Sequence, residues 1–165
     1  MGENLTEIRK LVIEKLKNHN QTKERLAALK RERENFAAIT ADDMIGSMNF
    51  AHGDGSGTSS RGYITDKTFL IAMSYQDEAS RLTEDARRQI ADEYFSVLQE
   101  VERLERFVSL LASDEERVIR MTFMEHLTNA RIADMMDITT RTVRKIRHCA
   151  LDNLCEMYRF AFSRR

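Results

Sequence analysis

The residues with the clearest chemical potential form a run of cations near the end of the chain. Positions 139–148 hold four Lys or Arg residues and no Asp or Glu. On a helix that buries Val143 and Ile146, the residues predicted to face outward are Thr139, Thr140, Arg141, Arg144, Lys145 and His148, with Arg147 alongside. Such side chains can bond base edges and phosphate oxygens of DNA. A solvated basic face is the alternative, and the run alone does not decide between the two.

The spacing around this run is that of a helix-turn-helix. Ala133 provides the small residue that two closely crossing helices require, and Asp137, four positions later, tolerates a left-handed turn. Val143, ten positions after Ala133, is the expected buried aliphatic residue. The predicted apolar interior is completed by Ile132, Ile138, Ile146, Ala150, Leu151 and Leu154. We therefore expect residues 113–165 to form a DNA-binding domain that reads the major groove with helix 139–154.

Polar residues mark the helix starts of this domain. Ser113 and Glu116 have the spacing of a capping box. Thr128 is expected to cap a short helix over 129–136, and Thr139 or Thr140 to cap the third helix. The expected phosphate contacts are Thr128, Arg131 and Arg147.

Two long helices must position this domain. The chain has no proline, which favours uninterrupted helices, and we expect an all-α fold. Residues 4–40 predict one helix, with an apolar seam that polar residues interrupt. Residues 64–112 predict a second helix, in which an apolar heptad runs through Ile90, Tyr94, Val97, Val101, Leu104, Val108 and Leu111. Residues 1–112 are thus expected to form an antiparallel coiled-coil hairpin, a scaffold that pairs within one chain, with a second copy, or both.

A Gly/Ser-rich loop is expected at residues 46–62. Its glycines lack the spacing of a nucleotide fingerprint, and no Gly-Lys-Ser/Thr follows them. We interpret the segment as a linker, and the alternative is a loop that becomes ordered on a partner.

Composition argues against catalysis and membrane insertion. His19, His52, His126 and His148 are scattered, so we expect neither an enzyme nor a metal or other cofactor. Cys149 and Cys155 lie six positions apart, out of disulfide geometry on a helix, and are interpreted as small buried apolar residues. No apolar run is long enough to cross a membrane, and a cytoplasmic, nucleoid-associated location is expected. Residues 114–165 hold 10 Lys or Arg against 8 Asp or Glu, so any DNA contact must come from the local cluster.

The stretch Leu111–Leu154 resembles region four of the bacterial sigma factors, which reads the −35 promoter element. The matching positions are Glu116–Ile119, Ile132-Ala133, Ile138-Thr139, Thr142-Val143 and then Ala150 and Leu154. Two positions depart from the pattern: Arg131 replaces the usual Glu, and Asp137 replaces the turn glycine. No second sigma region is found, so a complete sigma factor is not expected. The whole layout is similar to ArpU/RinA-type regulators of phages and integrated elements, which implies control of late phage or mobile-element genes.

Three functions are compatible with these patterns. The first is a dimeric, sequence-specific DNA-binding transcription regulator, with RNA polymerase as a further partner. The second is a phage small terminase-like DNA-packaging subunit, which would form a ring of many copies. The third is a coiled-coil interaction protein that does not bind DNA. We favour the first.

Overall fold

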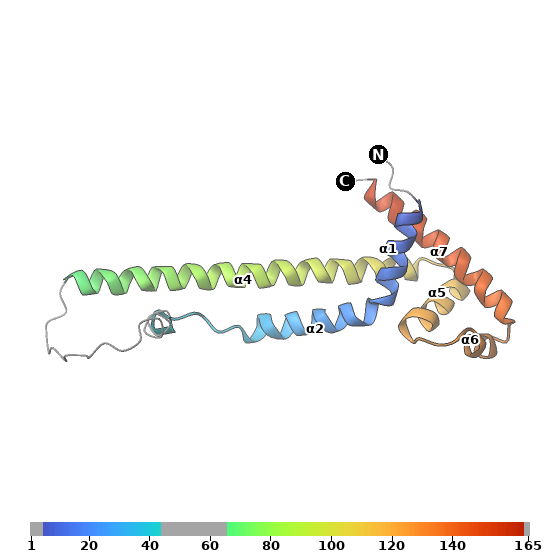
Figure 1. Ribbon diagram of the computed structural model, residues 1–165, viewed down its shortest axis with the longest axis horizontal. Coiled ribbons are helices and arrows are strands. Elements are labelled where there is room, and N and C mark those ends of the chain that lie inside the picture. Colours follow the sequence, from blue (N-terminus) through green and yellow to red (C-terminus); the bar gives the residue numbers. More distant parts are fainter. Residues whose placement is uncertain (1–4, 44–65, 164–165) are drawn as a thin grey trace. The chain divides into compact units, whose positions relative to one another are not determined.

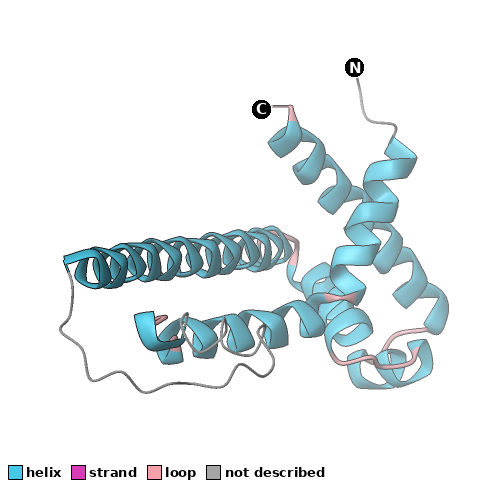
Figure 2. Cartoon of the chain, turned by 60° about the vertical axis from the view of Figure 1, so that its left-hand side comes forward, coloured by secondary structure: helices cyan, strands magenta, loops and turns pink. Residues whose placement is uncertain are grey.

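The computed structural model describes residues 5–43 and 66–163, and every regular element within these ranges is helical (Figures 1 and 2). The elements are α1 (Leu5–Lys17), α2 (His19–Asn35), α4 (Asp66–Ser109), α5 (Ser113–Ile119), the π-helix η1 (Arg120–Met124), α6 (Asn129–Met136) and α7 (Thr140–Phe162). The all-α prediction is therefore confirmed for the described part of the chain. The predicted loop at 46–62 lies outside the described residues.

The first predicted helix is divided in two. A turn at Asn18 separates α1 from α2, and α2 ends at Asn35 rather than near position 40. The carbonyl oxygen of Asn18 accepts both the amide of Thr22 at 2.8 Å and its hydroxyl at 2.9 Å. This second bond from a threonine hydroxyl is a common cause of helix bending. The prediction of one continuous helix over 4–40 was therefore wrong, and Figure 1 shows the change of direction at this point.

Contacts divide the chain into two compact units, which we describe separately. The first unit comprises residues 1–28 together with 95–165. Its main core is formed mostly by apolar residues of four helices: Ile8, Val12 and Leu16 of α1, Leu104 and Val108 of α4, Ile119 of α5, and Ala150, Leu151, Leu154, Cys155 and Tyr158 of α7. The ring of Tyr158 meets that of Phe107 edge to face, with centroids 4.9 Å apart. The first helix of the chain thus completes the core beneath the last one.

The apolar seam that was predicted for α4 is buried in the part that belongs to the first unit, from Val97 onward. Val97, Val101, Leu104, Val108 and Leu111 are all at most 8% exposed. Burial of such side chains contributes about 1.5–3 kcal/mol each, so this part of the seam is a main source of stability. In the described structure, residues of the same chain cover it.

The second unit comprises residues 29–94, described over 29–43 and 66–94. Here α4 packs against the end of α2: Leu29 is buried, and the guanidinium of Arg33 lies 4.3 Å from the ring centre of Tyr94. The amide of Ile39 donates to the hydroxyl of Thr83 at 3.0 Å. The packing of α2 with α4 agrees with the expected hairpin, whereas coiled-coil geometry stays a prediction. None of the described helices is long and apolar enough to span a membrane.

Candidate DNA-binding face

The predicted DNA-binding domain begins with α5, and this helix lacks the capping box predicted at its start. The N-cap residue is Ala112, with extended φ and ψ of −61° and 150°, and no side chain caps the helix. Because Ser113 is already the first helical residue, its hydroxyl is not at the position that a capping box needs. Glu116 instead accepts from the Nε atom of Arg120 at 2.8 Å. The Ser113–Glu116 capping box was therefore a wrong prediction.

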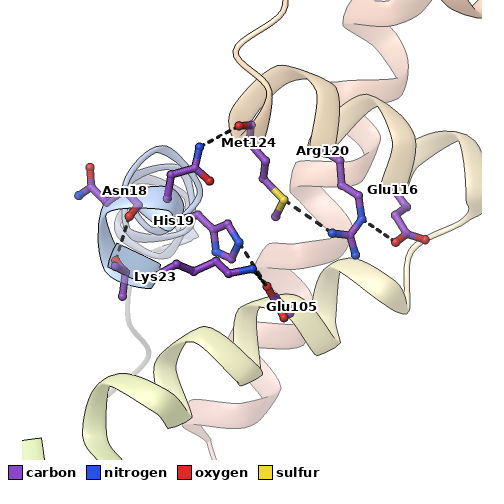
Figure 3. A network of polar contacts seen from close by, with 9 residues as sticks. Asn18, His19, Lys23, Glu105, Glu116, Arg120 and Met124 are labelled. Atoms are coloured by element: carbon purple, nitrogen blue, oxygen red, sulfur yellow. Dashed lines mark hydrogen bonds and ion pairs between the residues drawn. The ribbon is translucent and has the colours of Figure 1, made fainter. Parts of the chain in front are cut away.

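Helix α5 continues into the π-helical turn η1, which the sequence patterns did not predict. At the end of η1, the amide of Glu125 donates to the carbonyl oxygen of Arg120 at 3.0 Å, five positions back. The side chain of Asn20, on α2, donates to the carbonyl oxygen of Met124 at 2.8 Å and so satisfies a helix end that would otherwise lack a partner (Figure 3). His126 then adopts a positive φ of 56°. No local spacing signals this turn, because part of what holds it comes from α2.

A cluster of three polar side chains, His19, Lys23 and Glu105, lies beside this turn, between α2 and α4. The Nε2 atom of His19 lies 3.4 Å from a carboxylate oxygen of Glu105, and the Lys23 ammonium lies 3.0 Å from the same oxygen (Figure 3). His19 is only 3% exposed. Burial lowers the pKa of His19 below its ordinary value of 6.5, although the Glu105 carboxylate acts in the opposite direction. His19 is therefore a neutral residue in the packing, remote in sequence from the helix-turn-helix.

The helix-turn-helix itself has the predicted geometry. The Thr128 hydroxyl accepts the amide of Arg131 at the start of α6. Asp137 ends α6 in the left-handed region, with φ 55° and ψ 44°. The Thr139 hydroxyl accepts the amide of Thr142, so Thr139 rather than Thr140 caps α7. The caps at Thr128 and Thr139 and the left-handed turn are all confirmed.

A small apolar cluster fixes the angle between these helices. Ala133 is 4% exposed and Val143 fully buried. They pack together with Val118, Met121 and Ile132, and Ile138 and Ile146 border this cluster. Because this cluster holds one side of α7, the opposite side of its first turns is fixed as an outer face.

That outer face has the predicted cations. Arg141, Arg144 and Lys145 are exposed, as are Thr139 and Thr140. Within the described part of the chain, none of these three cations has an ion-pair partner. Their charges are therefore available to a polyanion in solution. We call Arg141, Arg144 and Lys145 the basic face.

The other predicted contact residues differ from one another in their surroundings. Arg131 is exposed. Arg147 is half-buried and donates to the side-chain oxygen of Asn129 at 3.0 Å, which links α7 to the start of α6. His148 is exposed, but its Nδ1 atom lies 2.9 Å from a carboxylate oxygen of Asp152. The other oxygen of Asp152 accepts from Arg9 of α1. His148 therefore lies beside an acidic residue, Asp152, which is outside the run 139–148 that the sequence singled out.

Helix α7 extends beyond Leu154, and the two cysteines that it carries differ in burial. Helix α7 continues to Phe162, because Leu154, Cys155 and Tyr158 extend its buried side into the main core. Cys155 is buried as expected, and burial raises the pKa of its thiol. Cys149 is exposed, so its interpretation as a buried residue was wrong.

Comparison with known proteins identifies this segment. Residues 109–156 match the family model of Sigma-70, region 4. This range includes α5, η1, α6 and the part of α7 that carries the basic face. The chain thus has a sigma-70 region 4 helix-turn-helix domain, and this domain implies DNA binding in a role related to transcription. Searches of curated proteins and of solved structures gave no match.

Proposed function

We propose that the protein is a sequence-specific DNA-binding transcription regulator that reads the major groove with the first turns of α7. The observation that supports this most strongly is the basic face: three exposed cations, without ion-pair partners in the described structure, on a helix whose other side is anchored by Val143. A recognition helix places the residues of its N-terminal half against base edges. The match to Sigma-70, region 4 covers these same turns.

The proposed roles follow from position and existing bonds. Arg141 and Lys145 are the proposed base readers, since an exposed Arg or Lys can bond guanine O6 and N7. Further base-facing residues are Thr139, Thr140, Arg144 and His148.

Thr128, Arg131 and Arg147 are the proposed phosphate contacts. Thr128 and Arg131 stand at the start of α6, and the amide groups at a helix N-terminus favour binding of an anion such as a phosphate. The bond from Arg147 to Asn129 keeps its guanidinium beside that helix start.

The wider setting is also part of the proposal. The similarity to ArpU/RinA-type regulators supports phage or mobile-element genes as the targets. We further propose a homodimer, RNA polymerase as a protein partner, and action at the nucleoid. In this scheme residues 1–112 are the scaffold of the dimer, and residues 113–165 bind DNA.

Selection from random duplex DNA tests the proposal. The full chain should enrich one sequence motif, and a variant with Arg141, Arg144 and Lys145 all changed to Ala should enrich none. Equal enrichment by both proteins, or none by the wild type, would contradict the proposed function.

Single variants then separate the two kinds of contact on the selected duplex. Arg141→Ala should lose about 1–3 kcal/mol of binding free energy and relax the preference at one base pair. Arg131→Ala should weaken binding to all sequences alike and reduce the salt slope by about one counterion. Indistinguishable behaviour of the two variants would refute these assignments.

A further inference from the structure

A groove lies between the end of α4 and the last turns of α7, beyond the segment that matches Sigma-70, region 4. Its volume is about 470 Å³. The groove is lined by Glu102, Arg103, Arg106 and Phe107 of α4, and by Met157 and Phe160 of α7, among others. Nothing in the proposed contacts with DNA uses this surface.

The groove has a firm apolar floor. Phe107 and Met157 are half-buried and pack on the main core, and the ring of Phe107 also rests on that of Tyr158. Phe160, by contrast, is 65% exposed. An exposed aromatic side chain beside a groove with an apolar floor and charged walls is typical of a protein interface.

The charges on the wall formed by α4 are self-complementary. Glu102 and Arg106 lie one helical turn apart, with Arg103 beside them. Within the described ranges, none of these three residues forms an ion pair. In an interface with two-fold symmetry, residue i of one copy meets residue j of the other, and the reverse also holds. Glu102 of each copy can then meet Arg106 of the other.

We infer that this groove is the interface through which a second copy of the chain binds, with Phe160 of each copy inserted into the groove of the other. The alternative surface for a dimer, the seam from Val97 to Leu111, is already covered by the same chain. This inference rests on the proposed function and extends its dimer interface beyond residues 1–112, because the end of α7 contributes Phe160 beside α4. It names the residues that hold two recognition helices together.

The length of α7 suits this arrangement. Arg144 and Phe160 are sixteen residues apart on one helix, which corresponds to about 24 Å at 1.5 Å per residue. Half-sites one turn of DNA apart place each recognition helix about 17 Å from the two-fold axis. Because about 24 Å exceeds this distance, an inclined α7 is long enough for the two basic faces to enter successive major grooves on one side of the duplex.

The first test is the mass of the full chain without DNA, measured by sedimentation equilibrium. The wild type should be a dimer, and Phe160→Glu a monomer with an unchanged circular dichroism spectrum. Leu110→Glu is the matched control, because Leu110 is 64% exposed but does not line the groove. It should remain a dimer. A monomeric wild type, a ring of many copies, or a dimeric Phe160→Glu would overturn the inference.

A charge exchange tests the two-fold pairing itself. Glu102→Arg and Arg106→Glu should each weaken the dimer at least about tenfold, whereas the double variant should restore it. Failure of the double variant to recover would overturn the proposed pairing.

DNA binding distinguishes failure of this inference from failure of the proposed function. Phe160→Glu should bind a single half-site as the wild type does, but lose about 100-fold on a duplex with two half-sites, since a linked second contact raises affinity by this order. Alanine replacements in the basic face should do the opposite, abolishing DNA binding while the protein stays dimeric. Equal affinity of Phe160→Glu and wild type for the two-site duplex would overturn the inference alone.

Discussion

The amide of Ile138 donates to the carbonyl oxygen of Ala133 at 3.0 Å, across a turn in which Asp137 is left-handed. This bond closes the end of α6 in the manner of a Schellman motif. It also allows α7 to begin only two residues later, at Thr140 with Thr139 as its cap. The angle at which the basic face is presented therefore depends on one residue with positive φ.

Asp137 should consequently tolerate glycine and reject a β-branched residue. A left-handed conformation costs an L-residue roughly 1–2 kcal/mol, a penalty that glycine avoids. Asp137→Gly should leave the free energy of unfolding unchanged or slightly higher, and Asp137→Val should lower it by about 1–2 kcal/mol or more. Urea denaturation measures both, with Asp134→Val on the exposed side of α6 as control. Equal stability of the two valine variants would contradict the role of the turn.

Two adjacent threonines should differ in their contribution to stability. The Thr139 hydroxyl caps α7, whereas Thr140 is exposed in its first turn. Loss of an N-cap costs about 0.5–2 kcal/mol, so Thr139→Ala should lower the thermal midpoint measurably. Thr140→Ala should not, since exposed substitutions usually change stability by less than about 0.5 kcal/mol. If Thr140→Ala were the more damaging of the two, the cap would be misassigned.

His19 should make the protein less stable in mild acid. Its pKa in the folded state is lowered by burial, so the unfolded chain takes up a proton at a higher pH than the folded one. The contribution of His19 is therefore fully present above pH 6.5 and is lost as the pH falls from 6.5 toward the folded pKa. His19→Leu should flatten the fall in unfolding free energy over this window. A slope equal to that of wild type would contradict this account.

The partner of His19 provides a second, directional test. The Glu105 carboxylate raises the pKa of His19 and so opposes the effect of burial. Glu105→Gln should lower the pKa of the imidazole further, as followed by NMR titration. A pKa that rose in this variant would show that Glu105 is not the interacting charge.

The seam residue Leu104 should be important for the fold of the first unit. Leu104 is 2% exposed and packs with α1 and α7 in the main core. Leu104→Ala should lower the free energy of unfolding by about 2–5 kcal/mol, the range for a buried leucine. The control is Leu82→Ala in the same helix, because Leu82 is 40% exposed and leaves no closed cavity. Similar losses in both variants would argue against a packed seam.

The features predicted successfully from sequence depend on short-range geometry. Ala133, Asp137 and Val143 stand within ten positions of one another, so the helix-turn-helix is encoded in local spacing and turn preference. The buried seam from Val97 to Leu111 likewise follows from the heptad spacing. The cap of α7 was narrowed to Thr139 or Thr140 by the N-cap preference of threonine, and the structure selects Thr139.

The features that were missed depend on contacts between distant residues. Arg9 bonds Asp152, 143 positions away, and so joins α1 to the recognition helix. Asn20 bonds the end of the π-helical turn from 104 positions away. The bend at Asn18 directs α1 onto α7, and no periodic pattern of residues 4–40 specifies that packing.

The most direct test of the central claim is a titration of DNA with wild type and with the variant in which Arg141, Arg144 and Lys145 are all Ala. Each protein is measured on the selected duplex and on a scrambled one, at two salt concentrations, with circular dichroism as the check of folding. We expect the folded triple variant to lose the preference for the selected duplex and to bind it more weakly, since the side chains proposed to read base edges are removed, and to keep the salt dependence that comes from the phosphate contacts of Arg131 and Arg147. Binding of both duplexes as in wild type would show that this side of α7 is only a solvated surface, and would contradict the proposed function.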